Sequence, residues 1–404
     1  MKKHPLLFWL RWLVRLSLLA LAVFFALGGP LPYWLGRAFP ALSPLAAISG
    51  AIVNRAWYTT LYWSLPPLIV LALAAWKGRF FCRWICPAGT LHALPAQISM
   101  KTKVFKHRIN GIFFWAIIGA SAIGLPSLLL LDPLAGFNRL TPWANGIHDV
   151  AVLIPGLILP AFLILSFFQP LVWCTHVCPL GYAFDLVHLR RKKTLIKQDE
   201  TRRAVLFGLG LAVPLAFLGK YVPKSLRAST ELPILPPGAK NPEQFAAACS
   251  RCYACVNACP THVIRIGMPS SDRSLGQYFQ PELNHMKGYC DEFCNQCSQV
   301  CPTSALNPLT VDQKRQRQIG VAKVRKEACL AWTDGEHCMV CQEFCPYLAI
   351  DTDESKDGLP RPVVNPEICR GCGFCQNQCP AIRDGIAIIV HGVERQGEAR
   401  NFQW

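Results

Sequence analysis

Long apolar stretches and short polar loops alternate through the first half of the chain. Five of these stretches approach the roughly 20 apolar residues that a helix needs to cross a bilayer. They lie at 7–27, 58–76, 111–131, 150–170 and 204–219. The pattern therefore predicts an N-terminal α-helical bundle of about five transmembrane helices.

The pattern changes after the fifth stretch. A proline-rich segment, ELPILPPGAKNP, leads into a region where short apolar runs alternate with cysteine-bearing loops. VVNPEICRGCGFCQNQCPAIRDGIAIIV combines an extended entry, a loop with glycines, a short helix after Cys375 and a β-branched exit strand. We expect a multi-domain membrane protein with a C-terminal α+β domain. Its predicted parts are the helical domain 1–203, a fifth helix at 204–219, a linker at 220–245 and the cysteine-rich domain 246–404.

Charge supports this division. The chain is 52% hydrophobic, with a net charge of +17, but residues 220–404 hold 20 Lys and Arg against 19 Asp and Glu. The excess lies in the bundle, where the N-terminus and the loops 77–108 and 190–203 hold 16 basic residues. The loops between them hold three, Arg37, Arg55 and Arg139. This asymmetry predicts that the N-terminus and both basic loops are cytoplasmic, and it argues against nucleic-acid binding.

Two arginines precede the fifth apolar stretch. TRRAVLFGLGLAVPLAFLG places Arg202 and Arg203 as in a twin-arginine export signal retained as an anchor. Alternatively, they follow the positive-inside rule alone. Both interpretations place the C-terminal domain in the periplasm of a bacterium whose inner membrane holds the bundle.

The bundle contains an internal repeat. FFCRWICPAGTLHAL after the second apolar stretch is echoed by VWCTHVCPLGYAFDL after the fourth. On the opposite side, SPLAAI at Ser43 is echoed by DPLAGF at Asp132. A pseudo-two-fold axis along the membrane normal would bring four cysteines together at the cytoplasmic face. These are Cys82, Cys86, Cys174 and Cys178.

Three roles are open for these four cysteines. In a helical turn a C-x3-C pair lies on one face, so two pairs could hold one further iron–sulfur cluster. They could instead shuttle electrons as transient disulfides, or pack helix ends. A cytoplasmic centre would be separated from a periplasmic domain by most of a hydrocarbon core about 30 Å thick, so bound quinone would have to bridge the gap or the centre would serve another role.

The other sixteen of the twenty cysteines form four groups, each ending in C-x2-C-x3-C-P. They are Cys249, Cys252, Cys255 and Cys259; Cys290, Cys294, Cys297 and Cys301; Cys329, Cys338, Cys341 and Cys345; and Cys369, Cys372, Cys375 and Cys379. The repeated spacing is that of bacterial ferredoxins, so it favours four [4Fe–4S] clusters over disulfides or zinc and predicts a tandem ferredoxin-like domain. Either the first and last groups pair around the middle two, or neighbours pair in sequence.

Such clusters carry single electrons, so the chain is expected to be a conduit. It has no C-x-x-C-H haem motif and no G-x-G-x-x-G motif, which leaves a membrane quinol as the expected donor. Asp132, His148 and Asp149 lie near outer helix ends, where a proton acceptor could meet a quinol headgroup. Polar groups at helix ends more often serve as caps, and no residue is assigned a catalytic role.

Two stretches carry a family resemblance. GRFFCRWICP and WCTHVCPLG resemble the NapH-type membrane ferredoxin protein of periplasmic nitrate reductase systems, and PPGAKNPEQFAAACSRCYACVNACPTHVIRI resembles its NapG/MauM-type partner ferredoxin. The chain therefore resembles a fusion of the two, although it lacks the two cytoplasmic ferredoxin motifs of the NapH type. The resemblance implies a quinol dehydrogenase module that passes electrons to a periplasmic partner such as a cytochrome or reductase. The alternative is a maturation factor that supplies electrons while a metalloenzyme is built.

Overall fold

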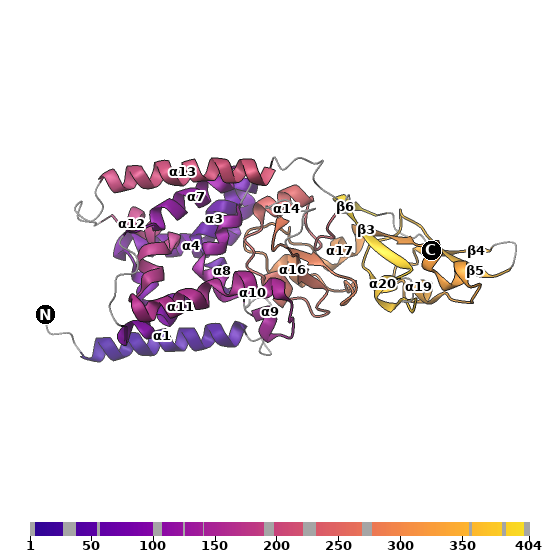
Figure 1. The fold of residues 1–404 in the computed structure, drawn as a ribbon, viewed down its shortest axis with the longest axis horizontal. Helices are drawn as coiled ribbons and strands as arrows, with labels where there is room; N and C mark the ends of the chain where they lie inside the picture. The colour runs from indigo at the N-terminus through magenta and orange to yellow at the C-terminus, as the bar shows by residue number, and fades with distance from the viewer. Residues whose placement is uncertain are drawn as a thin grey trace.

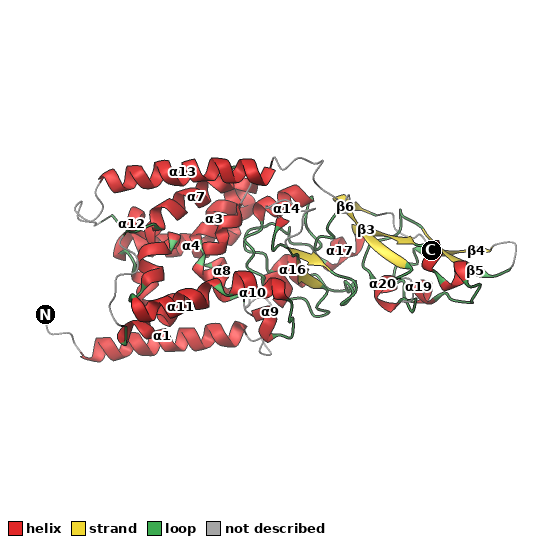
Figure 2. Ribbon diagram, viewed as in Figure 1, coloured by secondary structure: helices red, strands yellow, loops and turns green. Residues whose placement is uncertain are grey.

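A computed structural model describes residues 5–26, 38–54, 57–99, 107–123, 126–139, 141–189, 198–220, 232–268, 277–354, 358–381 and 385–399. The described part is elongated, with a helical bundle at one end and a region of short helices, strands and loops at the other (Figure 1). Colouring by secondary structure separates the two regions (Figure 2). The loop residues Arg37 and Arg55 and most of the second basic loop lie outside the described residues.

Helices account for most of the first region. They are α1 (Pro5–Ala26), α2 (Ala38–Ala41), α3 (Pro44–Asn54), α4 (Trp57–Lys77), α5 (Phe80–Trp84), α6 (Pro87–Ala93), α7 (Asn110–Ala122), α8 (Pro133–Phe137), α9 (Thr141–Ala144), α10 (Val150–Gly156), α11 (Ile158–Phe168), α12 (Pro179–Val187) and α13 (Gln198–Lys220). Two short 3-10 helices, η2 (Pro95–Gln97) and η3 (Pro126–Leu131), and one π-helical turn, η4 (Trp173–Val177), complete this region as described.

The five predicted apolar stretches fall on α1, α4, α7, α10–α11 and α13. The third stretch is not one continuous helix, because α7 ends at Ala122 and η3 begins at a proline, which cannot donate a backbone hydrogen bond. Within the described residues, Val150–Phe168 is long and apolar enough to cross a membrane. Apolar helical segments at Pro44–Asn54, Leu65–Lys77 and Asn110–Ala122 are shorter. That the bundle spans a membrane stays a prediction.

The longest helix, α13, packs along α7. A Cβ on Gly119 would approach the Cβ of Ala212 to 2.8 Å, and one on Gly208 would approach the carbonyl oxygen of Ile112 to 2.7 Å. Glycine at these two positions lets the helix backbones come close, as small residues do between membrane helices.

The echoed motifs SPLAAI and DPLAGF begin the short helices α3 and α8, which the apolar pattern did not predict. Proline is favoured in the first helical turn, and the preceding Ser43 and Asp132 side chains accept backbone hydrogen bonds from Ala46 and Leu134. The two caps also meet, because the Ser43 hydroxyl donates to the Asp132 carboxylate at 2.5 Å. This contact joins the two halves of the repeat.

The described residues of the second region form three two-stranded antiparallel sheets, β1–β2, β3–β6 and β4–β5. The strands are β1 (Ile264–Ile266), β2 (Pro281–Leu283), β3 (Arg317–Val324), β4 (Ile350–Glu354), β5 (Pro360–Val364) and β6 (Ile388–Glu398). The helices are α14 (Pro242–Ala248), α15 (Ala254–Asn257), α16 (Gln296–Gln299), α17 (Val311–Gln316), α18 (Leu330–Thr333), α19 (Val340–Glu343) and α20 (Phe374–Gln378), with η8 at Lys326–Ala328. The short helices and hairpins leave long loops for the cysteines.

The described end of the predicted linker is not a free tether. Leu235 is 4% exposed, and the Ile234 carbonyl accepts from the Leu283 backbone N–H at 2.8 Å. Gln396 of β6 donates to the Leu235 and Pro236 carbonyls and accepts from the Gly238 N–H, each at 3.0–3.1 Å. The segment therefore holds the strand pairs together, because its backbone finds partners on both β2 and β6.

The two regions share a hydrophobic core. Ile147 and Val152 of the bundle lie in one buried cluster with Phe245 and Tyr253 of the cysteine-rich domain. Asn54 donates to the Thr303 carbonyl at 3.1 Å across the same contact. The cysteine-rich domain is thus packed directly on one end of the bundle.

Candidate iron–sulfur centres

The sixteen clustered cysteines converge in four tetrads, and neighbouring groups in the sequence pair. Each tetrad takes three cysteines of one group and the last cysteine of its neighbour. The proximal tetrad is Cys249, Cys252, Cys255 and Cys301; the second is Cys259, Cys290, Cys294 and Cys297; the third is Cys345, Cys369, Cys372 and Cys375; and the distal tetrad is Cys329, Cys338, Cys341 and Cys379. This crossed arrangement is the ferredoxin one, and it decides the pairing that the sequence left open.

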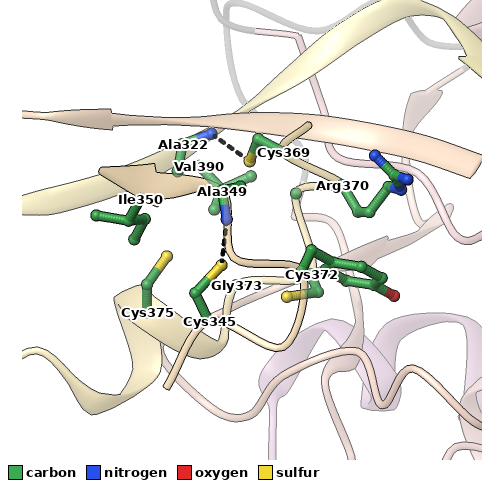
Figure 3. A pocket seen from close by; sticks show the side chains of 12 residues that line it. Ala322, Cys345, Ala349, Ile350, Cys369, Arg370, Cys372, Gly373, Cys375 and Val390 are labelled. Carbon is green, nitrogen blue, oxygen red and sulfur yellow. Dashed lines mark hydrogen bonds between the residues drawn. The ribbon is translucent and has the colours of Figure 1, made fainter. Parts of the chain in front are cut away.

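The third tetrad shows how each site is built (Figure 3). Its side chains come from the loop before α20, from α20 itself and from the chain that leads into β4. The backbone N–H of Ala322 donates to the Cys369 sulfur at 3.4 Å, and that of Ala349 donates to Cys345 at 3.3 Å. N–H donors to cysteine sulfur help to set the potential of a bound cluster.

Left-handed backbone wraps these loops around their sites. Gly371 and Gly373 have φ of 72° and 79° in the fourth group, and the matching positions of the first group hold Arg251 and Tyr253 at φ 53° and 59°. Alternating backbone hands turn successive N–H groups toward an anion, as in many iron–sulfur sites. A bound cluster with four thiolates is such an anion.

Burial makes these thiols poor acids when no metal is bound. It raises the pKa of Cys249 to about 11 and that of Cys252 to about 12 in the proximal tetrad. In the third tetrad it raises the pKa of Cys372 to about 12. Buried thiolates need a cation to compensate their charge, which an iron–sulfur core supplies.

The tetrads are too open for a single ion. Four thiolates around zinc lie about 4 Å apart, since each Zn–S bond is about 2.3 Å. Among the described residues, no three His, Cys, Asp or Glu side chains are close enough to hold one metal ion. A cubane holds its four cysteine sulfurs further apart than a single ion does, so the residues fit that cofactor better than zinc.

The four tetrads follow one another away from the bundle. Cys252 and Cys255 share a hydrophobic cluster with Ala135 of α8. The second and third tetrads meet where the Cys290 N–H donates to the Cys372 carbonyl at 2.8 Å. Beside this contact, the rings of Tyr289 and Phe374 stack with centroids 4.0 Å apart.

The four bundle cysteines, Cys82, Cys86, Cys174 and Cys178, also gather, and we call them the bundle tetrad. Cys86 and Cys178 are buried in one hydrophobic cluster, with Cys82 and Cys174 packed against it. The two cysteines of each C-x3-C pair do not lie within one continuous helix. Cys86 is the N-cap of α6 and Cys178 that of α12, because the following proline ends the preceding turn.

Charged side chains that the motif analysis missed brace the bundle tetrad. Arg79 donates to both carboxylate oxygens of Asp185, at 2.9 and 2.6 Å, and to the Cys174 carbonyl at 3.0 Å. From α1, the buried Arg15 donates to the Gly89 carbonyl at 2.8 Å. Their only sequence signal was position, since Arg79 and Asp185 flank equivalent cysteine motifs.

The three candidate proton acceptors have structural partners. Asp132 is 1% exposed and engaged by Ser43 and the Leu134 N–H. Asp149 forms an ion pair with Arg265 at 3.4 Å, and the His148 ring packs edge-on against Trp143. Each therefore has the capping or packing role that helix-end polar groups usually have.

Comparison with known proteins agrees with this geometry. The family model described as "4Fe-4S dicluster domain" matches residues 248–305 and 336–382, one match for each pair of tetrads. The model described as "4Fe-4S binding domain" matches residues 59–104 and 151–197, which contain the bundle tetrad. These matches indicate that the protein binds [4Fe–4S] clusters.

Three relatives give the family. The methylamine utilization ferredoxin-type protein MauM of Methylophilus methylotrophus is 35% identical over 46% of this chain and 84% of its own length. The chain belongs to this ferredoxin-type family. The ferredoxin-type proteins NapF and NapG of Escherichia coli are 33% and 32% identical, over 36% and 42% of this chain and 80% and 76% of their own lengths.

This MauM/NapF/NapG relationship makes the chain an iron–sulfur electron-transfer protein. Its NapH-type half stays a prediction. The comparison with solved structures finds no match.

Proposed function

We propose that this protein is a membrane-anchored conduit that takes electrons from a membrane quinol and delivers them to a periplasmic redox partner. The observation that carries the proposal is the row of tetrads that begins against the bundle and runs away from it. Each of the four tetrads would hold one [4Fe–4S] cluster, which supplies one-electron chemistry when bound. The residues around them shield the sites and fix their order.

Exposed apolar side chains support an anchoring role for the bundle. On α1, Leu6, Trp9 and Leu13 are 81%, 69% and 63% exposed, and Leu206 and Phe207 of α13 are 73% and 65% exposed. These two helices lie on opposite sides of the bundle (Figure 1). Apolar surface of this extent is unfavourable in water and suits contact with lipid acyl chains.

The bundle tetrad would hold a fifth iron–sulfur centre. Its four cysteines come from both halves of the repeat and are mostly buried, and Arg15 adds positive charge near Cys86 and Cys174, while the charge of Arg79 is paired with Asp185. A lipid-soluble quinol reaches such a centre from the bilayer, whereas a water-soluble donor does not. Quinol oxidation releases two electrons and two protons, and the conduit accepts the electrons one at a time.

Anaerobic reduction by a quinol tests the conduit. The cluster-loaded protein in lipid nanodiscs is mixed with a short-chain quinol, and cluster bleaching is followed by absorbance. We expect bleaching that continues into the third and distal tetrads, because the clusters exchange electrons along the row. A Cys252→Ser variant should take fewer electrons from quinol while dithionite still reduces its remaining clusters.

Two outcomes would contradict the proposal. If dithionite reduces the clusters of the loaded protein but the quinol does not, the quinol is not its electron donor. Equal quinol reduction of the third and distal tetrads in Cys252→Ser would show that electrons bypass the proximal site. A maturation factor would instead be dispensable once its client enzyme is made, which a depletion experiment after induction would reveal.

Iron counting tests the fifth centre. Four cubanes require about 16 iron atoms per chain, and a fifth centre raises this to about 18 or 20. The double variant Cys82→Ser plus Cys174→Ser should lose only the iron atoms of the fifth centre. A fully loaded protein that stays at about 16, with no loss in the double variant, would leave the dithiol or packing role for these cysteines.

A further inference from the structure

Helix α8 packs against the residues around the bundle tetrad and against those around the proximal tetrad. Leu134 is 0% exposed and lies in the hydrophobic cluster that contains Cys86 and Cys178. The next residue, Ala135, is 1% exposed and lies in the cluster that contains Cys252. Consecutive Cα atoms are about 3.8 Å apart, so one short helix joins the packing around the two sites.

The position of α8 is fixed from both ends. At its start Asp132 caps the helix and is hydrogen-bonded to Ser43 at the head of α3. Along its length it packs against α6, whose N-cap is Cys86. The motif DPLAGF therefore packs into the bundle, and its helix contacts the surroundings of both sites.

Arg139 follows α8 and is 1% exposed. Its guanidinium donates to the Arg251 carbonyl at 3.1 Å, to the Leu129 carbonyl at 3.0 Å and to the Leu130 carbonyl. Arg251 directly precedes Cys252, so this bond ties the bundle to the loop that presents a proximal cysteine. In the described part of the chain, the hydrogen bonds of Arg139 all go to backbone carbonyls.

The charge of Arg139 lies beside the proximal tetrad, because its guanidinium is bonded to the residue that precedes Cys252. On the bundle side, Asp132 caps α8, whose Leu134 packs in the cluster of Cys86. A buried cation beside a cluster favours the reduced state, which carries one more negative charge. The low dielectric of a buried contact strengthens this effect.

We propose that α8 and Arg139 form an electron-transfer junction between the bundle tetrad and the proximal tetrad. Arg139 is its positioning residue, which also raises the reduction potential of the proximal site. With both sites loaded, one electron would pass from the bundle centre, oxidised by one, to the proximal centre, reduced by one, across the contacts of Leu134, Ala135 and Arg139. No bond or proton changes. The junction rests on the fifth centre of the proposed function.

Redox titration followed by electron paramagnetic resonance tests the role of Arg139 in the loaded full-length protein. Arg139→Gln should lower the reduction potential of the proximal site by at least about 59 mV, which corresponds to a tenfold change in the equilibrium constant for one-electron reduction. Arg139→Lys should restore most of that potential. Arg265→Gln is the matched control, because it removes an interface cation that is paired with Asp149, and its proximal potential should be unchanged.

A second measurement needs no change at Arg139. The fully reduced wild-type protein should show magnetic coupling between the bundle and proximal centres, and Cys82→Ser plus Cys174→Ser should abolish it. The junction alone would be overturned if the double variant contains less iron but keeps the magnetic coupling, and Arg139→Gln keeps the wild-type proximal potential. If the iron content of the double variant equals that of the wild type, both the fifth centre and the junction are overturned.

Discussion

Single residues at left-handed positions determine how closely the cluster loops pack. Gly373 has a φ of 79°, and a Cβ there would lie 2.0 Å from Nδ1 of His285. His285 is 2% exposed and comes from the chain between β2 and Cys290. Burial lowers the pKa of this imidazole to about 4, so the neutral ring is the form that packs at the contact between the second and third tetrads.

Gly373→Ala is expected to destabilise the ferredoxin domain by about 2 kcal/mol or more, because it combines a left-handed φ with a steric clash. The measurement is thermal unfolding of the loaded protein, with release of iron from the third tetrad as a second readout. Gly358→Ala is the matched control, since Gly358 has a φ of 68° but nothing within 4 Å of the added Cβ. Equal effects of the two substitutions would show that packing against His285 is unimportant.

Among the elements, β6 has a role beyond pairing with β3. Gln396 is 7% exposed, and its amide satisfies three backbone groups of the 232–240 segment. That segment in turn hydrogen-bonds to β2 through Ile234. The antiparallel pair β3–β6 and the segment therefore connect the first pair of tetrads to the second.

Gln396→Leu is expected to lower the free energy of unfolding by about 1–3 kcal/mol, because it leaves buried backbone groups without partners. Limited proteolysis before Leu235 should become faster as the segment detaches. The exposed neighbour Arg395→Leu serves as the control for an apolar substitution on the same strand. Unchanged proteolysis and stability in Gln396→Leu would contradict the connecting role.

At the scale of the whole molecule, the bundle and the ferredoxin domain form one packed unit. Phe245 and Val152 share a core although one lies in the cysteine-rich domain and the other in the bundle. Such a contact holds the proximal tetrad at a fixed place relative to the bundle. The proposed electron exchange between sites in the two regions would benefit from that fixed geometry.

The proposed topology predicts where fusions are active. A reporter enzyme that works only outside the cytoplasm should be active when fused after Trp404 and inactive when fused after His188, between α12 and α13. The positive-inside asymmetry and the odd number of predicted spans both give this result. Activity with the opposite distribution would place the ferredoxin domain in the cytoplasm and exclude a periplasmic partner.

Features that depend on neighbours along the chain could be predicted from the amino-acid sequence. The spacing within each cysteine group identified the loops that form the tetrads, because a ferredoxin loop is a local structure whose reach is set by a few covalent links. The echo between FFCRWICP and VWCTHVCP likewise located the bundle tetrad. The loop glycine Gly371 was visible too, but the left-handed Arg251 at the matching position was not, since most residues avoid that conformation.

How these local pieces combine became clear from the three-dimensional fold. Either pairing of the cysteine groups was compatible with the spacing. In the structure, the first group packs with the second and the third with the fourth, each pair around its own hydrophobic cluster. Asp132, one of the residues weighed beside a quinol site, caps α8 by accepting from the Leu134 N–H and is held in place by Ser43, 89 positions away in the chain. Arg139 carried no motif, and its place beside Cys252 arises from packing between two regions. Such contacts depend on burial and on long-range hydrogen bonds, which no local pattern encodes.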